Sequence, residues 1–172
     1  MTAVLAIDPG TKCGWALRRD GDLTSGVWDL LPTRKTKHHT RWLNLWSCLD
    51  EIGPVSCVAY ELVMAHPSAG AKLGRKGPGF NTRAAHVYGG IVAVIEMWAD
   101  HRKVLVMGEH VGRIKKHATE RGNATKLSML EAARKRWPDQ SVATHDQADA
   151  LWLLDLVMRG WSDSGSALTE EE

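Results

Sequence analysis

The chain begins with an apolar run that ends in an acidic residue and meets a tight turn. Residues 3–7 read AVLAI, Asp8 follows, and Pro9-Gly10-Thr11 comes directly after it. Five apolar residues are too few for a buried helix, and the proline and glycine behind them favour a short buried strand. The chain must therefore fold around a strand that carries a carboxylate at its carboxyl end.

The remaining sequence alternates between strand and helix patterns. We expect strands over 13–18, 23–28, 56–61 and 103–107, and helices over 36–51 and 82–101. Two more helices are expected: one begins at Asn123 or Ala124 with Asn123 as N-cap, and one runs from a Thr144–Gln147 capping box to a stop at Gly160. This order predicts an α/β fold with one mixed five-stranded sheet flanked by helices.

The length of 172 residues, 44% of them apolar, suits a single domain. We assign it to residues 1–161 and expect 162–172 to be a disordered acidic tail. No run approaches the roughly 18 apolar residues of a membrane span, and the N-terminus reads as a strand, so a cytoplasmic protein without membrane contacts is expected. Three scattered cysteines without a CxxC pair suggest neither disulfides nor zinc.

Charge is distributed unevenly along the chain. Residues 72–136 hold 14 Lys and Arg against 5 Asp and Glu, whereas residues 137–172 hold 1 against 8. A basic middle of this kind predicts binding to a polyanion, with an ordinary solvated face as the alternative explanation.

Four acids stand where the predicted elements would bring them together. Asp8 and Glu61 end two predicted strands, and Asp146 and Asp149 lie one turn apart on the last predicted helix. Each has a structural explanation when taken alone, as a turn residue, a helix-dipole residue or a solvated acid. Together they would repel one another unless cations neutralise them, and hard oxygen ligands favour Mg²⁺ or Mn²⁺.

The same acids lie in motifs that resemble those of RuvC-type Holliday-junction resolvases. Leu5-Ala-Ile-Asp8-Pro-Gly-Thr11 is similar to the first-strand motif of that family, Ala59-Tyr-Glu61 to its second acidic motif, and His145-Asp-Gln-Ala-Asp149-Ala-Leu151 to its third. The three occur in family order, and the resemblance spans roughly residues 3–157. It implies a ribonuclease H-like fold, with the four acids as catalytic ligands of two Mg²⁺ ions, Mn²⁺ substituting, and no small-molecule cofactor.

A basic segment extends the resemblance. Residues 114–126, IKKHATERGNATK, are similar to the junction-contacting segment of the family, with Lys115 and Lys126 at the positions of its two functional lysines. Physically, cationic side chains and an exposed helix start can neutralise phosphates, although a solvated basic helix end would have the same composition. The residues expected to contact DNA are Lys72, Arg75, Lys76, Phe80, Lys115, Lys116, Arg121, Asn123 and Lys126.

The chain also departs from the family pattern. Typical bacterial members carry an aromatic wedge shortly after the second acid, whereas this chain has Met64 there. We therefore expect Phe80 or Met64 to act as the wedge, with a core position as the alternative for Phe80. The Gly-rich basic loop resembles a phage-type or divergent resolvase, which places the protein in a bacterial cell or an infected host. His145 either assists the site or is simply exposed.

The resemblance implies a homodimeric endonuclease that resolves four-way DNA junctions, and other branched DNA, by paired symmetric nicks. The sequence leaves three alternatives open: a YqgF-like RNA-processing nuclease, a junction-binding protein without catalysis, and an actin-like kinase or ATPase domain. The intact set of four acids disfavours loss of catalysis, and the short chain lacks a second lobe for ATP.

Overall fold

The strand that opens the chain lies at the centre of a five-stranded sheet of order β3-β2-β1-β4-β5. The computed structural model describes residues 3–32, 39–63 and 82–167. Its elements are β1 (Ala3–Asp8), β2 (Lys12–Arg19), β3 (Asp22–Asp29), α1 (Thr40–Ile52), β4 (Cys57–Leu62), α2 (Thr82–Arg102), β5 (Leu105–His110), α3 (Val111–Thr119), α4 (Lys126–Arg136) and α5 (His145–Ala167). The predicted mixed five-stranded sheet with flanking helices is confirmed.

The sheet combines two kinds of strand pairing. β1, β2 and β3 form an antiparallel meander, whereas β4 runs parallel to both β1 and β5. Parallel neighbours need a crossover, and α1 and α2 supply the two crossovers. The carboxyl ends of β1 and β4 consequently lie at one edge of the sheet.

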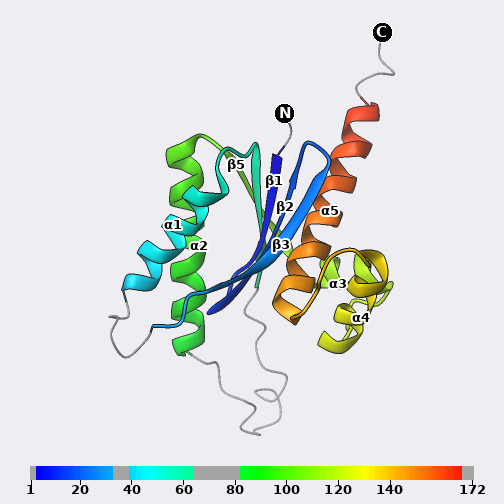
Figure 1. Ribbon diagram of the computed structural model, residues 1–172, viewed down its shortest axis with the longest axis horizontal. Helices are drawn as coiled ribbons and strands as arrows, with labels where there is room; N and C mark the ends of the chain where they lie inside the picture. The colour runs from blue at the N-terminus through cyan, green and yellow to red at the C-terminus, as the bar shows by residue number, and fades with distance from the viewer. Residues whose placement is uncertain (1–2, 33–38, 64–81, 168–172) are drawn as a thin grey trace, which may run out of the picture.

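Helices cover both faces of the sheet (Figure 1). One face carries Leu5, Ile7 and Val58, which are buried against α1 and α2 together with residues such as Leu45 and Ile91. The opposite face carries small residues, Val4, Ala6, Ala16, Cys57 and Ala59, which are buried against α3, α4 and α5. Small side chains on this second face let α5 lie close to the strands.

The region after β5 differs from the expectation. The strand predicted over 103–107 lies at Leu105–His110, and residues 111–119, for which no helix was predicted, form the helix α3. α3 ends at Thr119, and the next residue, Glu120, caps it: Glu120 takes the left-handed conformation at φ 62° and donates its N–H to the Lys116 carbonyl. This position usually holds glycine, so the helix end had no recognisable signal in the sequence.

The predicted N-cap of α4 is also wrong. Thr125, not Asn123, caps this helix, because the Thr125 hydroxyl accepts a hydrogen bond from the Ser128 backbone N–H at 3.2 Å. α4 consequently begins at Lys126.

The last helix starts as predicted but ends later. The Thr144 hydroxyl accepts a hydrogen bond from the Gln147 backbone N–H at 3.2 Å, as the capping box predicts. The Gln147 side chain accepts from the backbone N–H of Ala143 and not from that of Thr144, which a capping box would use. α5 runs through Gly160 to Ala167, so the predicted stop at Gly160 is wrong. Within the described residues the positive-φ glycines are Gly21 and Gly53, so Gly160 does not adopt the conformation that ends a helix.

Within the described part of the chain, no helix combines the length and apolar character that a membrane crossing requires.

Candidate active site

Asp8 and Glu61 occupy matching positions on two neighbouring parallel strands. Ile7 of β1 lies opposite Tyr60 of β4, and the next residue of each strand is one of the two acids. Ile7 and Tyr60 are buried on the face covered by α1 and α2. Because side chains alternate along a strand, Asp8 and Glu61 face the α5 side at the same edge of the sheet.

The first turns of α5 bring two further acids over this edge. Asp146 is in the first turn of the helix, and Asp149 follows three residues later on the same side. Gly14 of β2, which pairs with Asp8, allows the close approach: a Cβ at Gly14 would collide with the Asp146 carbonyl oxygen. Gly14 was not predicted as part of the site, although a glycine inside a strand is a recognised sign of close backbone approach.

The four carboxylates affect one another strongly. Burial raises the pKa of Asp8 well above its usual value, and the charges of Glu61, Asp149 and Asp146 raise it further. Burial, then repulsion from Asp149, raises the pKa of Glu61 to about 7. The pKa of Asp149 rises to about 6, chiefly through burial, with Asp146 adding to the rise. The structure therefore brings all four predicted acids into one electrostatic group.

Lys115 and Lys126 belong to the same group. The charge of Lys126 lowers the pKa values of Asp8, Glu61 and Asp149, and that of Lys115 lowers those of Glu61 and Asp149. Lys115 comes from the middle of α3 and Lys126 is the first residue of α4. Both helices lie beside α5 in Figure 1.

Of the other residues predicted to contact DNA, some are exposed in the structure and the rest lie outside the described residues. Lys116, Arg121 and Asn123 are exposed on α3 and the connection to α4. The loop residues Lys72, Arg75, Lys76 and Phe80, and the second wedge candidate Met64, lie outside the described residues.

A tyrosine that the sequence analysis did not single out holds the strand end that carries Glu61. The Tyr88 hydroxyl of α2 donates to the Glu61 carbonyl at 3.0 Å and accepts from the Val63 N–H at 2.9 Å. These bonds fix the backbone on both sides of Leu62, where β4 ends. No sequence signal marks Tyr88, because the contact depends on how α2 crosses the sheet.

His145 joins the starts of α4 and α5. Its Nδ1 atom lies 3.0 Å from the Lys126 backbone oxygen. The sequence left its role open between assisting the site and simple exposure, and the structure shows a specific contact for it.

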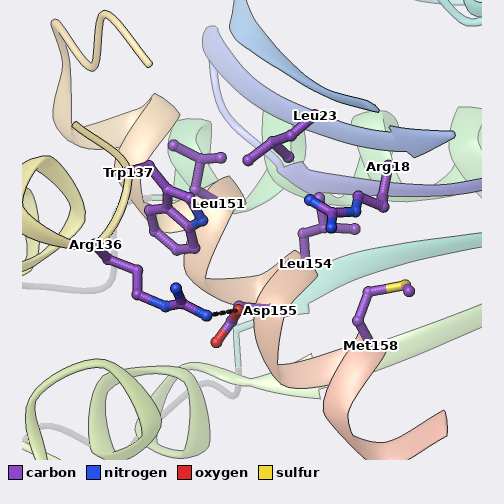
Figure 2. A pocket seen from close by; sticks show the side chains of 8 residues that line it. All are labelled: Arg18, Leu23, Arg136, Trp137, Leu151, Leu154, Asp155 and Met158. Atoms are coloured by element: carbon purple, nitrogen blue, oxygen red, sulfur yellow. Dashed lines mark hydrogen bonds and ion pairs between the residues drawn. The ribbon is translucent and has the colours of Figure 1, made fainter. Parts of the chain in front are cut away.

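The third aspartate of α5 has a different environment. Asp155 forms an ion pair with Arg136 of α4 at 3.5 Å and lies 2.8 Å from the His117 Nε2 of α3. Figure 2 shows Asp155 and Arg136 at a cavity of about 250 Å³, whose lining includes none of the four grouped acids. The cavity is lined by Arg18, Leu23, Arg136, Trp137, Leu151, Leu154, Asp155 and Met158. Asp155 thus ties α3 and α4 to α5.

The donor set of the acidic group suits a hard divalent cation. Carboxylates with raised pKa values gain the most when a cation neutralises them, and oxygen ligands without cysteine fit Mg²⁺ or Mn²⁺. Within the described residues, no three acidic, histidine or cysteine side chains are arranged closely enough to hold a metal ion. Like-charge repulsion disfavours a tighter arrangement of the acids by themselves.

Solved structures of junction resolvases share this fold. RuvC of Thermus thermophilus in complex with Holliday junction substrate aligns with a TM-score of 0.70 and 16% identity, covering 96% of this chain and 97% of that one. Another structure of the same RuvC aligns at 0.61 with 16% identity, covering 88% and 90%. The yeast mitochondrial Holliday junction resolvase Ydc2 aligns at 0.59 with 14% identity, covering 92% and 78%.

No protein-family model and no curated protein matches the sequence. The structural alignments confirm the predicted ribonuclease H-like fold, and they confirm the resemblance to RuvC-type resolvases at the level of the fold.

Proposed function

We propose that this chain is a divalent-metal-dependent endonuclease of the RuvC type that resolves four-way DNA junctions by paired, symmetric nicks. The observation that carries the proposal is the grouping of Asp8, Glu61, Asp146 and Asp149 at one edge of the sheet, with Lys115 and Lys126 beside them. The same fold is found in a RuvC bound to a Holliday junction.

The acids would hold the metal ions. Asp8 and Glu61 approach from the sheet and Asp146 and Asp149 from α5, so a cation between them would have oxygen ligands on two sides. When bound, two Mg²⁺ ions supply Lewis-acid stabilisation of the attacking and leaving oxygens in phosphodiester hydrolysis, and Mn²⁺ would substitute. The protein needs no side-chain nucleophile for this reaction.

The lysines would act on the phosphate. Lys115 and Lys126 place positive charge next to the acids, where negative charge accumulates on the scissile phosphate in the transition state. Lys116, Arg121 and Asn123 are exposed on the same connection and would contact flanking phosphates. These contacts position DNA without reading its sequence.

A homodimer fits the proposed reaction. Symmetric nicks in a four-way junction need two equivalent sites, which a two-fold pair of chains supplies. We therefore propose branched DNA and a second copy of this chain as the partners.

The proposal is tested by incubating the protein with a labelled four-way junction in Mg²⁺, beside linear duplex and RNA–DNA hybrid. Paired nicks at symmetric positions of the junction are expected, and Asp146→Asn and Asp149→Asn should each abolish them. Asp100→Asn is the matched control, because Asp100 is an exposed acid at the far end of α2.

Two other outcomes would redirect the assignment. Tight junction binding without cleavage in Mg²⁺ or Mn²⁺ would indicate a non-catalytic junction-binding protein. Cleavage confined to the RNA-containing substrate would indicate a YqgF-like RNA-processing nuclease.

A further inference from the structure

A side-chain hydrogen bond connects the two helix starts that carry the candidate catalytic groups. His145 is the first residue of α5 and Lys126 the first residue of α4, and 3.0 Å separates the His145 Nδ1 atom from the Lys126 carbonyl oxygen. A carbonyl oxygen can only accept, so the Nδ1 atom must carry the proton and donate. The contact thus selects one tautomer of His145.

A second hydrogen bond of the same kind connects α5 to α4. Further along, the Trp152 indole N–H of α5 donates to the Met129 carbonyl of α4 at 3.2 Å. Both bonds run from an α5 side chain to an α4 backbone oxygen, so together they fix how far α4 is displaced along α5. The Trp152 bond is buried in the core, whereas the His145 bond lies at the helix starts, beside the candidate site.

The consequence concerns the position of Lys126. Its ammonium group acts on Asp8, Glu61 and Asp149, so its backbone must be held relative to both α5 and the sheet. The Thr125 cap organises the first turn of α4 through its hydrogen bonds to Ser128, within the segment that α4 itself provides. His145 provides that contact at Lys126 itself.

We propose that His145 is a positioning residue whose Nδ1–H donor holds the start of α4 against α5, so that the Lys126 ammonium stays at the carboxylates. This inference rests on the proposed nuclease function. It assigns the positioning role to the Nδ1 atom and uses no contact of Nε2.

The two ring nitrogens can be tested separately. An asparagine side chain places its amide N–H₂ near the Nδ1 position, whereas glutamine places it near the Nε2 position. We expect His145→Ala and His145→Gln to slow single-turnover junction cleavage by about 10- to 100-fold, the usual effect of losing an orienting partner. His145→Asn should restore most of the rate, and junction affinity should change little in all three variants.

A double-mutant cycle tests whether His145 acts through Lys126. If it does, adding His145→Ala to Lys126→Ala should slow cleavage no further than Lys126→Ala alone. Independent losses in the double variant would overturn the proposal. Rescue by glutamine and not by asparagine would overturn it in favour of a role for Nε2.

A measurement without cleavage separates this inference from the proposed function. Long-range ¹H–¹⁵N spectra of the wild-type protein at alkaline pH should show the Nδ1–H tautomer of His145. The Nε2–H tautomer would overturn the contact and the proposal with it. A wild-type protein that shows the expected tautomer but cleaves no branched DNA would overturn the proposed function, and with it the catalytic purpose of the contact.

Discussion

The carboxylates of the candidate site are costly to ionise in the folded protein. The pKa of Asp149 is about 6 against an ordinary value of 3.8, and burial is the main cause. Between these pH values the folded protein holds a proton that the unfolded chain has released. The free energy of unfolding therefore falls as the pH rises from about 4 to about 6, and it stays lower above that range.

Replacing Asp149 by asparagine should therefore stabilise the metal-free protein at high pH. In EDTA at pH 8 we expect Asp149→Asn to raise the free energy of unfolding by about 1–3 kcal/mol, an increase in Tm of roughly 2–12 °C for a chain of this size. At pH 4 the difference should largely disappear. Scanning calorimetry at pH 4, 6 and 8 measures this, and a variant no more stable than wild type at pH 8 would contradict it.

Magnesium should reverse the order of stability. Neutralising the acids should raise the Tm of the wild-type protein at pH 8, and the variant should respond less because it has lost one ligand. Asp100→Asn, which changes an exposed acid, should respond to Mg²⁺ like the wild type.

The Tyr88 hydroxyl should matter for activity beyond its contribution to stability. Tyr88→Phe removes both hydrogen bonds at the end of β4 while keeping the ring. We expect a loss of about 1–3 kcal/mol in stability, and a decrease in cleavage rate of roughly tenfold because Glu61 is less firmly placed. Single-turnover kinetics and thermal unfolding measure the two effects.

Tyr60→Phe is the matched control for this prediction. Its hydroxyl donates to Glu96 at 2.6 Å on the opposite face, so it should keep the wild-type cleavage rate. Equal rates for Tyr88→Phe and wild type would show that the Tyr88 contact has no part in placing Glu61.

Among single residues, the sequence predicted those whose side-chain chemistry and position within a predicted strand or helix both point to the site. Asp8 and Glu61 end apolar runs, and Asp146 and Asp149 have helical spacing, so their meeting could be predicted. Gly14 and Tyr88 were not identified as parts of the site and the role of His145 was left open, because each makes a contact between elements distant in the sequence.

At the element scale, the docking of α5 on β2 depends on a missing side chain. Gly14→Ala would place a methyl group against the Asp146 carbonyl, and this backbone atom cannot move without shifting the start of the helix. We expect a loss of about 1–3 kcal/mol in stability from overpacking. Cleavage should fall more than stability explains, because Asp146 and Asp149 move with the helix.

Gly89→Ala provides the comparison for this variant. Gly89 lies within α2 with no atom near the position of an added Cβ. Alanine there should leave cleavage unchanged and stabilise the helix by about 0.5–1 kcal/mol. Thermal unfolding and junction cleavage are measured for both variants, and full activity in Gly14→Ala would show that the helix start tolerates the shift.

Some helices could be predicted from the sequence and others could not. α2 and the start of α5 follow apolar periodicity and a capping box, and both were predicted. α3 was missed because its end depends on a left-handed glutamate, and α5 continues past Gly160 because glycine ends a helix only when it adopts positive φ.

At the scale of the whole molecule, the basic middle of the chain should make junction binding strongly salt-dependent. Lysine and arginine that neutralise phosphates release counterions, so affinity falls as salt rises. Removing the exposed side chains in Lys116→Ala/Arg121→Ala should weaken binding and reduce the slope of log affinity against log salt by about 1–2. Fluorescence anisotropy between low and moderate salt measures the slope.

Arg102→Ala is the control for this prediction. Arg102 pairs with Asp50 at the end of α2, where α1 and α2 meet, so its removal should leave the slope unchanged. An unchanged slope in the Lys116→Ala/Arg121→Ala variant would show that these residues do not contact phosphate.

The order of elements predicted the sheet and its flanking helices, but not how the three helices after β5 are held. That arrangement depends on Asp155, which contacts His117 of α3 and Arg136 of α4. An aspartate in an apolar helix pattern carries no sign of such partners, and it resembles Asp149 in the sequence.

The positions of the four acids along the chain also affect when the acidic group forms during folding. β1, β2 and β3 pair through local contacts, which form quickly, whereas β4, β5 and α5 join through contacts of long sequence separation, which form slowly. Asp146 and Asp149 lie on α5, which follows all five strands of the sheet in the sequence. A nascent chain that has not yet reached α5 therefore carries only Asp8 and Glu61 of the four acids, so the acidic group cannot form before α5 has been synthesised.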